Sequence, residues 1–143
     1  MARPPLAERY LRVTEIFHSI QGESTWAGLP CTFVRLTGCP LRCVWCDTEY
    51  AFFGGEKLSL EDILRRVQEM GTGLVEVTGG EPLVRKGVTR FLSELAALDG
   101  VKDLSLTTNG VLLADMAHDL KAAGLSRVTV SRRSIPGTST PCT

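Results

Sequence analysis

The sequence lacks a net charge, because 16 lysines and arginines balance 16 aspartates and glutamates. This balance removes the overall electrostatic basis for binding nucleic acid. The chain also lacks any apolar run of about 18 residues, the length that a membrane-spanning helix requires. Its first segment, MARPPLAERYLRV, has no apolar core of the kind that secretory signals contain. We therefore expect a cytoplasmic protein without a membrane or nucleic-acid partner, whose five cysteines stay reduced.

Length and hydrophobic pattern indicate one α/β domain. The chain has 143 residues, close to the usual size of a single domain. Short β-branched segments alternate with segments of helical period, which is typical of βαβ units and a parallel sheet. Residues 1–131 form this domain, and residues 132–143 are expected to be a disordered tail. The expected strands are Val13–Ile20, Thr32–Leu36, Leu74–Thr78, Asp103–Thr108 and Arg127–Ser131, and the expected helices are Ser59 (N-cap) to Met70, Val88–Leu98 and Leu112–Ala123.

The segments that follow the expected strands carry most of the unusual residues. Active sites on parallel sheets lie at the carboxyl ends of the strands. In this chain those ends carry a cysteine-rich loop that starts at Gly38, the segment from Thr78 to Glu81, the segment from Thr108 to Gly110, and Ser131. We therefore expect all four segments at one rim of the sheet.

Three cysteines, Cys39, Cys43 and Cys46, lie within eight residues of one another in that loop. Thiolates this close in sequence can converge on one metal centre. A zinc site usually takes four ligands, and no fourth cysteine or histidine follows nearby. A four-iron cluster on three cysteines leaves one iron without a protein ligand, and a small molecule can chelate that iron. A zinc loop short of a ligand and a fortuitous cluster are the alternatives. Cys31, in contrast, is expected to be a core residue.

The turn Gly79-Gly80-Glu81-Pro82 is the second candidate element. Glycines permit positive φ or the close approach of a ligand to the backbone. The carboxylate of Glu81 can accept a hydrogen bond from an ammonium group. A purely structural strand-to-helix turn would explain the same four residues.

Together, CPLRCVWC and VTGGEP resemble the radical S-adenosylmethionine (SAM) superfamily. The resemblance implies a partial (β/α) barrel with parallel strands, a [4Fe-4S] cluster on the three cysteines, and SAM bound to the fourth iron. It further implies that the GGEP segment binds the methionyl amino group, and that cleavage of SAM yields a 5'-deoxyadenosyl radical that abstracts hydrogen from the substrate. The protein's own part is to bind and orient these groups.

A narrower resemblance covers residues 13 to 83, where SIQGES, WCDT and VTGGEP are similar to the family of 7-carboxy-7-deazaguanine synthases. That family converts 6-carboxy-5,6,7,8-tetrahydropterin to 7-carboxy-7-deazaguanine, a lyase step on the route to queuosine. The resemblance implies Mg²⁺ on the hydroxyl of Thr48, an oxygen ligand of the kind that Mg²⁺ prefers. The implied cluster ligands are Cys39, Cys43 and Cys46; the implied SAM contacts are Trp45, Cys46, Asp47, Gly79, Gly80, Glu81, Asn109 and Ser131; the implied pterin contacts are Ile20, Gln21, Gly22, Arg35 and Thr78.

The second half of the sequence, from PLVRKG to SRVTVS, is more similar to the GTP 3',8-cyclases of molybdenum cofactor synthesis. A cyclase-like enzyme and an inactive, truncated or chimeric fragment therefore stand as alternatives. Because only four strands are found in the βα repeat, we expect a truncated barrel with an open strand edge after Arg127–Ser131. We expect the isolated chain to be marginally stable, to form a homodimer or aggregate through this edge, and to turn over slowly or not at all. The implied reaction also needs an electron donor such as flavodoxin.

Overall fold

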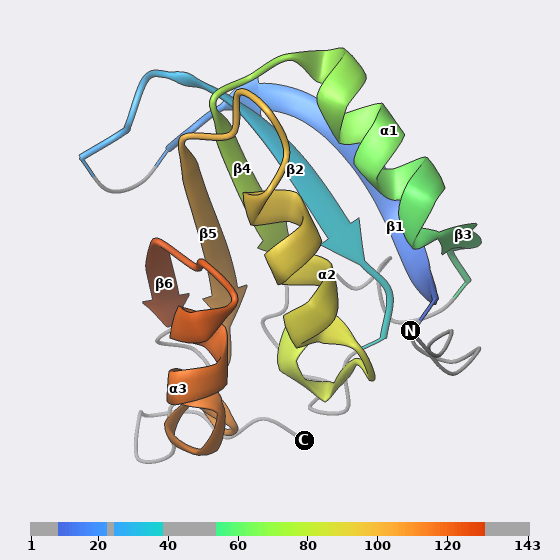
Figure 1. The fold of residues 1–143 in the computed structure, drawn as a ribbon, viewed down its shortest axis with the longest axis vertical. Coiled ribbons are helices and arrows are strands. Elements are labelled where there is room, and N and C mark those ends of the chain that lie inside the picture. The colour runs from blue at the N-terminus through green and yellow to red at the C-terminus, as the bar shows by residue number, and fades with distance from the viewer. Residues whose placement is uncertain (1–8, 23–24, 39–53, 131–143) are drawn as a thin grey trace.

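A six-stranded sheet with helices on one face organises the chain (Figure 1). The computed structural model describes residues 9–22, 25–38 and 54–130. The strands lie side by side in the order β3-β1-β2-β4-β5-β6. The elements are β1 (Tyr10–Ile20), β2 (Pro30–Leu36), β3 (Glu56–Ser59), α1 (Leu60–Met70), β4 (Leu74–Thr78), the short 3₁₀ helix η3 (Pro82–Val84), α2 (Val88–Ala96), β5 (Asp103–Thr108), α3 (Leu113–Ala122) and β6 (Arg127–Val130).

Four of these strands form the expected parallel repeat. β2 pairs in parallel with β4, β4 with β5, and β5 with β6. The helices α1, α2 and α3 lie in the connections between successive members of this set. The prediction of an α/β fold with parallel strands is therefore confirmed, and the carboxyl ends of all four strands lie along one rim.

The amino-terminal part differs from the expectation, because β1 is antiparallel to its two neighbours. It pairs with β2 from Ile20↔Pro30 to Val13↔Leu36, and its first residues pair with β3, from Tyr10↔Ser59 to Val13↔Glu56. The sequence pattern predicted a start at Val13 and missed β3 altogether. β3 has only four residues, two of them charged and exposed, so its alternation is too short to be recognised.

The helices begin and end close to the predicted positions. In α1, the backbone N–H of Asp62 donates to the hydroxyl of Ser59 at 3.1 Å, and Gly71 ends the helix with a φ of 68°. Helix α2 ends two residues before the predicted Leu98, and α3 is one residue shorter at each end. Differences of this size at helix ends are ordinary, because the terminal turns fray.

The hydrophobic core lies between the sheet and its helices. Alternate residues of the central strands, among them Val34, Val77 and Leu106, are buried against apolar residues of α1 and α2. Phe91 is the largest fully buried side chain among the described residues. Cys31 is fully buried, as expected for a core residue. Within the described ranges, no helix is long and apolar enough to cross a membrane.

Candidate functional site

The parallel strands bring several predicted site residues together at their carboxyl ends. Arg35 of β2 and Thr78 of β4 are register partners on neighbouring strands. The Gly79-Gly80 turn follows Thr78 directly, and Asn109 follows the last residue of β5, the next strand of the sheet. Residues predicted to contact substrate and cofactor thus share one rim.

Both glycines of the turn are required by close backbone approach. Gly79 has a φ of 76° and Gly80 a φ of 52°, which L-residues rarely adopt. A Cβ on Gly79 would overlap the side chain of Arg35, and a Cβ on Gly80 would overlap the carbonyl oxygen of Gly38. The backbone N–H of Glu81 also donates to that carbonyl at 3.1 Å. The turn therefore packs directly on Gly38, the first residue of the cysteine loop.

The carboxylate of Glu81 joins the ends of β4 and β5. Its side chain is 2% exposed. One oxygen, Oε1, accepts from the hydroxyl of Thr108 at 2.6 Å and from the backbone N–H of Leu83 at 3.1 Å. The other, Oε2, accepts from the backbone N–H of Asn109 at 2.7 Å. Three donors of its own chain thus meet this carboxylate, which acts as a brace between the two strand ends. The expected contact of Glu81 with an ammonium group stays a prediction.

Asn109 is held by this brace and by its own turn. Its Oδ1 accepts from the backbone N–H of Val111 at 2.9 Å, and the hydroxyl of Thr108 accepts from the N–H of Gly110 at 3.2 Å. These contacts keep the loop after β5 close to the Gly79-Gly80 turn. The rim is consequently a preorganised piece of backbone rather than a set of long, freely moving side chains.

The sheet face opposite the helices is polar and carries aromatic side chains near the rim. The Nε of Arg35 lies 2.8 Å from Oε1 of Glu15 on β1, and its guanidinium lies over the ring of Phe17, 5.4 Å from the centroid. Phe17 in turn stacks on Phe33, with ring centroids 5.1 Å apart. A cation beside stacked rings can bind a flat aromatic ligand that bears a carboxylate.

Further along the same face lies a buried polar network that the sequence analysis missed. Oε1 of Glu76, in the middle of β4, accepts from the hydroxyls of Ser105 and Thr107 at 3.4 and 3.3 Å. Arg127 donates to Oδ2 of Asp103 from Nε and Nη2 at 2.9 and 2.6 Å, and this hydrogen bonding raises the pKa of Arg127. A glutamate inside the apolar strand LVEVT was the signal that could have revealed the network.

Cys31 borders this network on β2. Burial raises the pKa of its thiol to about 12, and the negative charge of Glu76 adds to the effect. A thiol with such a pKa stays protonated and unreactive at neutral pH. This agrees with a packing role for Cys31 and sets it apart from the three cysteines of the loop.

The segment Ile20 to Gly22 does not join the rim. Ile20 pairs with Pro30 at the start of β2, so it lies about 16 Å along the strand from Arg35. Ile20 is exposed, whereas Gln21 is buried with its Nε2 4.0 Å from the sulfur of Cys31. Antiparallel pairing of β1 with β2 is the cause, because it places the end of β1 beside the beginning of β2.

The remaining predicted site residues lie outside the described residues. They are Cys39, Cys43, Trp45, Cys46, Asp47, Thr48 and Ser131. The described part of the site therefore consists of Arg35, Thr78, Gly79, Gly80, Glu81 and Asn109, together with the polar face beneath them.

Arg85, which follows η3, also lies against the beginning of the cysteine loop. A Cβ placed on Gly38 would lie 3.2 Å from its Nη1 and 3.4 Å from its Cζ and Nη2. The Nε of Arg85 is buried and has no hydrogen-bond partner among the described residues. A buried, unpaired guanidinium nitrogen is unusual, and it fits a neighbourhood built for a negatively charged group. The residues present thus suit an anionic cluster at this rim.

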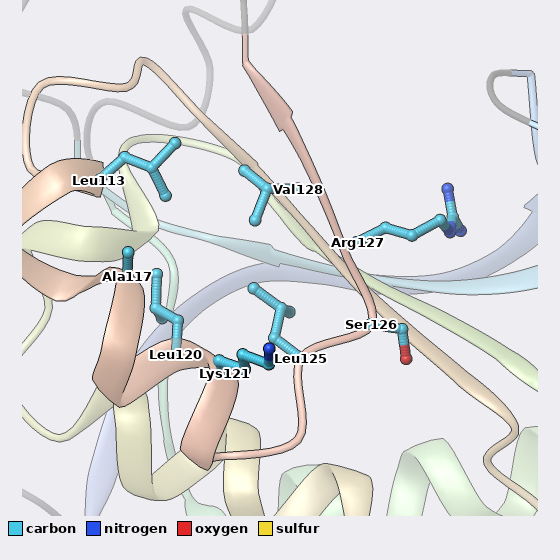
Figure 2. Close-up of a pocket in the computed structure, with 8 residues that line it drawn as sticks. All are labelled: Leu113, Ala117, Leu120, Lys121, Leu125, Ser126, Arg127 and Val128. Carbon is cyan, nitrogen blue, oxygen red and sulfur yellow. The ribbon is translucent and has the colours of Figure 1, made fainter.

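A hollow of about 260 Å³ lies elsewhere, between α3 and β6 (Figure 2). Figure 2 shows the side chain of Arg127 pointing away from the other residues of this hollow. Val128 faces the helices in register with Leu106 of β5, so the hollow belongs to the helix-covered face and not to the rim. Its lining residues are Leu113, Ala117, Leu120, Lys121, Leu125, Ser126, Arg127 and Val128.

A mostly parallel sheet with helices on one face and a glycine turn beside a cysteine loop defines a class, the partial (β/α) barrels that carry their chemistry at the carboxyl rim. Comparison with protein families identifies one superfamily within this class. The model of the radical SAM superfamily matches residues 33–135, and the chain belongs to this superfamily. The family implies a [4Fe-4S] cluster and SAM as cofactors.

Known relatives show both resemblances noted in the sequence. The chain is 47% identical over 112 residues to 7-carboxy-7-deazaguanine synthase of Koribacter versatilis, which covers 77% of this chain and 49% of that protein. It is 44% identical over 104 residues to GTP 3',8-cyclase of Thermodesulfovibrio yellowstonii, which covers 68% of this chain and 32% of that protein. The chain thus spans about half the length of the deazaguanine synthases that it matches.

A solved structure supports the fold. The crystal structure of QueE from Escherichia coli superposes with a TM-score of 0.57 at 28% identity, covering 71% of this chain and 53% of that one. The expected radical SAM type of partial barrel is consistent with this similarity. Both resemblances drawn from the motifs, to the deazaguanine synthases and to the cyclases, are confirmed as sequence similarity.

Proposed function

We propose that this chain is a radical SAM enzyme of the 7-carboxy-7-deazaguanine synthase type, which converts 6-carboxy-5,6,7,8-tetrahydropterin to 7-carboxy-7-deazaguanine. The observation that carries the proposal is the pairing of Arg35 with Thr78 at the rim, directly beside the Gly79-Gly80 turn. The similarity to deazaguanine synthases over 77% of the chain supports it.

In this proposal Cys39, Cys43 and Cys46 hold the [4Fe-4S] cluster, and Thr48 provides an oxygen ligand to Mg²⁺. When bound, the cluster and SAM supply a 5'-deoxyadenosyl radical. The turn backbone at Gly79-Gly80 and the loop at Asn109 contact SAM, and Glu81 keeps these two segments at a fixed separation through its three hydrogen bonds. Preorganised backbone is suited to this task, because it orients a ligand without losing side-chain entropy on binding. The further SAM contacts proposed are Trp45, Cys46, Asp47 and Ser131.

The carboxylated pterin is proposed to bind on the polar face below the rim. The guanidinium of Arg35 would exchange its ion pair with the partly exposed Glu15 for the substrate carboxylate. The stacked rings of Phe17 and Phe33 offer an apolar wall for the flat bicycle, and the hydroxyl of Thr78 adds a hydrogen bond. This placement uses Arg35 and Thr78 and does not use Ile20, Gln21 or Gly22, which lie at the other end of β2.

The cluster assignment is tested with a pair of cysteine variants. After anaerobic reconstitution, Cys43→Ala should lose most iron and acid-labile sulfide, whereas Cys31→Ala should retain both, because Cys31 is buried in the sheet. Retention of the cluster in Cys43→Ala with its loss in Cys31→Ala would contradict the assignment. Zinc in place of iron would contradict it as well.

The second candidate is a GTP 3',8-cyclase, which the similarity of the chain to that enzyme favours. Substrate binding separates the two functions, since the pterin carries a carboxylate and GTP a triphosphate. Isothermal titration of the reconstituted protein with SAM present should give binding of the carboxylated pterin that weakens in Arg35→Met. Tight binding of GTP without binding of the pterin would move the chain to the cyclase function.

An electron donor such as flavodoxin, a cytoplasmic location and a homodimer complete the proposal. The dimer is proposed to form through β6, which is at the edge of the described sheet and exposes Val128 and Val130. Light scattering at increasing protein concentration tests it. A monodisperse monomer with a cooperative melt above about 60 °C, the upper part of the usual mesophile range, would contradict both the dimer and the expected marginal stability.

A further inference from the structure

Arg85 has no role in the proposed function. It belongs to none of the predicted contact sets, yet its guanidinium lies only 3.2–3.4 Å from the position that a Cβ of Gly38 would take. Gly38 has a φ of 98°, and its carbonyl oxygen accepts from the N–H of Glu81. Position 38 is therefore anchored, with the guanidinium packed on one side of it.

The next residue along the chain is Cys39, the first predicted ligand of the cluster. Consecutive α-carbons are about 3.8 Å apart, so the anchored Gly38 places the guanidinium of Arg85 close to the start of the loop. This nearness follows from the chain connection alone.

The charge of Arg85 has no partner in the described part of the chain. No hydrogen bond or ion pair is found for its guanidinium there, and its buried Nε lacks any acceptor. Arg90 and Arg35 differ in this respect, since Arg90 pairs with Glu94 and Arg35 with Glu15. Arg9 is the other described residue with a buried, unpaired Nε. Leaving a buried donor unpaired is costly, which indicates that a negative charge belongs beside it.

A four-iron cluster on three thiolates carries a net negative charge that increases on reduction. The reduction potential of such a cluster depends on the net charge and hydrogen bonding around it. Building on the proposed function, we propose that Arg85 is a positioning residue whose positive charge compensates the cluster and favours its reduced state. The residue acts through charge at the cysteine loop and not through contact with the substrate.

The test compares three substitutions in the reconstituted protein. Arg85→Met retains the aliphatic stem and removes the charge, Arg85→Lys retains the charge, and Arg90→Met removes a charge of the same sign from the exposed face of α2. The ratio of reduced to oxidised cluster is measured by electron paramagnetic resonance without SAM, in redox mediators poised with dithionite at the midpoint of the unsubstituted protein. Arg85→Met should lower this ratio about tenfold, the size expected for the loss of one nearby charge in a partly buried site. Arg85→Lys and Arg90→Met should change it less than threefold.

A second measurement separates this role from a structural one. Because Arg85→Met removes an unsatisfied buried donor, the thermal midpoint of the cluster-free protein should stay the same or rise. A fall in that midpoint, or loss of the cluster in both Arg85→Met and Arg85→Lys, would assign Arg85 to packing. Loss of the cluster in Arg85→Met alone would support the role of its charge.

An unchanged ratio in a fully loaded Arg85→Met overturns this inference and leaves the proposed function standing. A weaker affinity for SAM at an unchanged ratio also overturns it, because the charge would then serve the SAM carboxylate. Failure of the unsubstituted protein to load any iron overturns the cluster assignment itself, and the inference with it.

Discussion

Strand β2 presents Val34 and Leu36 to the helices and Phe33 and Arg35 to the opposite face, and the whole sheet repeats this division. On the helix side the central strands bury aliphatic residues against α1 and α2. On the other side they carry Glu76, ion pairs and stacked rings. One face thus stabilises the fold, while the other holds polar groups that cost stability unless each finds a partner. The contribution of each face to stability and to ligand binding can be tested by substitutions that leave the other face intact.

The largest difference in the free energy of unfolding is expected between alanine substitutions at two phenylalanines, one on each face. Phe91 is fully buried on α2, and Phe91→Ala should lower the free energy of unfolding by about 3–5 kcal/mol. Phe33 lies on the polar face and is only partly buried, so Phe33→Ala should cost less than about 2 kcal/mol. Urea denaturation of the cluster-free protein measures both. Equal costs would show that the polar face is a second core.

The next largest effect concerns the rim. Glycine is needed there both for its positive φ and because a Cβ would overlap a neighbouring backbone atom. Gly80 and Gly71 both have positive φ, but a Cβ on Gly71 would meet nothing within 4 Å, whereas one on Gly80 would overlap the carbonyl oxygen of Gly38. Gly71→Ala should cost about 1 kcal/mol from backbone strain alone. Gly80→Ala should cost at least about 2 kcal/mol more and should also reduce iron loading. Similar losses in the two variants would mean that the turn does not support the cysteine loop.

A smaller effect depends on pH and comes from Cys31. Burial raises the pKa of its thiol to about 12 in the folded protein, from 9.0 in the unfolded chain. The unfolded state therefore releases the proton first, so the stability that this thiol provides is complete below pH 9 and is lost as pH rises from 9 towards 12. Comparing the protein with Cys31→Ala by urea denaturation in reductant at pH 8, 9 and 10 isolates this thiol. The difference in unfolding free energy should shrink by up to about 1.4 kcal/mol per pH unit above 9, and a constant difference would contradict the buried, protonated thiol.

The smallest effect on stability is expected at Arg35, although its effect on function should be large. Its partner Glu15 is 41% exposed, so Arg35→Met should change the free energy of unfolding by less than about 1 kcal/mol. Binding of the carboxylated pterin, measured by calorimetry, should nevertheless be clearly weakened. Undiminished binding would remove Arg35 from the proposed substrate site.

Arg127 provides the matched control on the same face. Its pair with Asp103 is more buried and lies at the opposite end of the strands. Arg127→Met should therefore cost more stability than Arg35→Met, because it leaves a buried carboxylate unpaired, and should leave pterin binding unchanged. Loss of pterin binding in Arg127→Met, with binding retained in Arg35→Met, would show that the substrate site is not at the rim.

Local signals predicted the repeating part of the fold well. Ser59 and Gly71 mark the ends of α1 because capping depends on a few neighbouring residues. The strands β4, β5 and β6 were recognisable because each is short and rich in β-branched or aliphatic residues. In addition, β4 is followed by two glycines and β5 by a polar turn. Placement of the Gly79-Gly80 turn and Asn109 at one rim then followed from the parallel pairing.

Features that depend on distant partners could not be read from the sequence. Neither the antiparallel pairing of β1 nor the existence of β3 follows from local period, since β3 is defined only by its register with the start of β1. The buried position of Glu81 was missed for the same reason, because two of its three donors come from Thr108 and Asn109, 27 and 28 residues away. The assignment of Ile20 to Gly22 as pterin contacts rested on resemblance alone, and it stays a prediction.

The order of the parallel strands has a consequence for how the molecule is made. β2, β4, β5 and β6 lie in the sheet in the order in which a ribosome releases them. Each newly synthesised βα unit can therefore dock on the edge left by the preceding one, without waiting for a later segment to insert between strands already paired. Domains that grow in this direction can assemble during translation, at synthesis rates of about 5–20 residues per second. The parallel part of the sheet can thus grow by addition at one edge, whereas β3 is added at the opposite edge, beside β1. Among the described strands β6 is the last to be added.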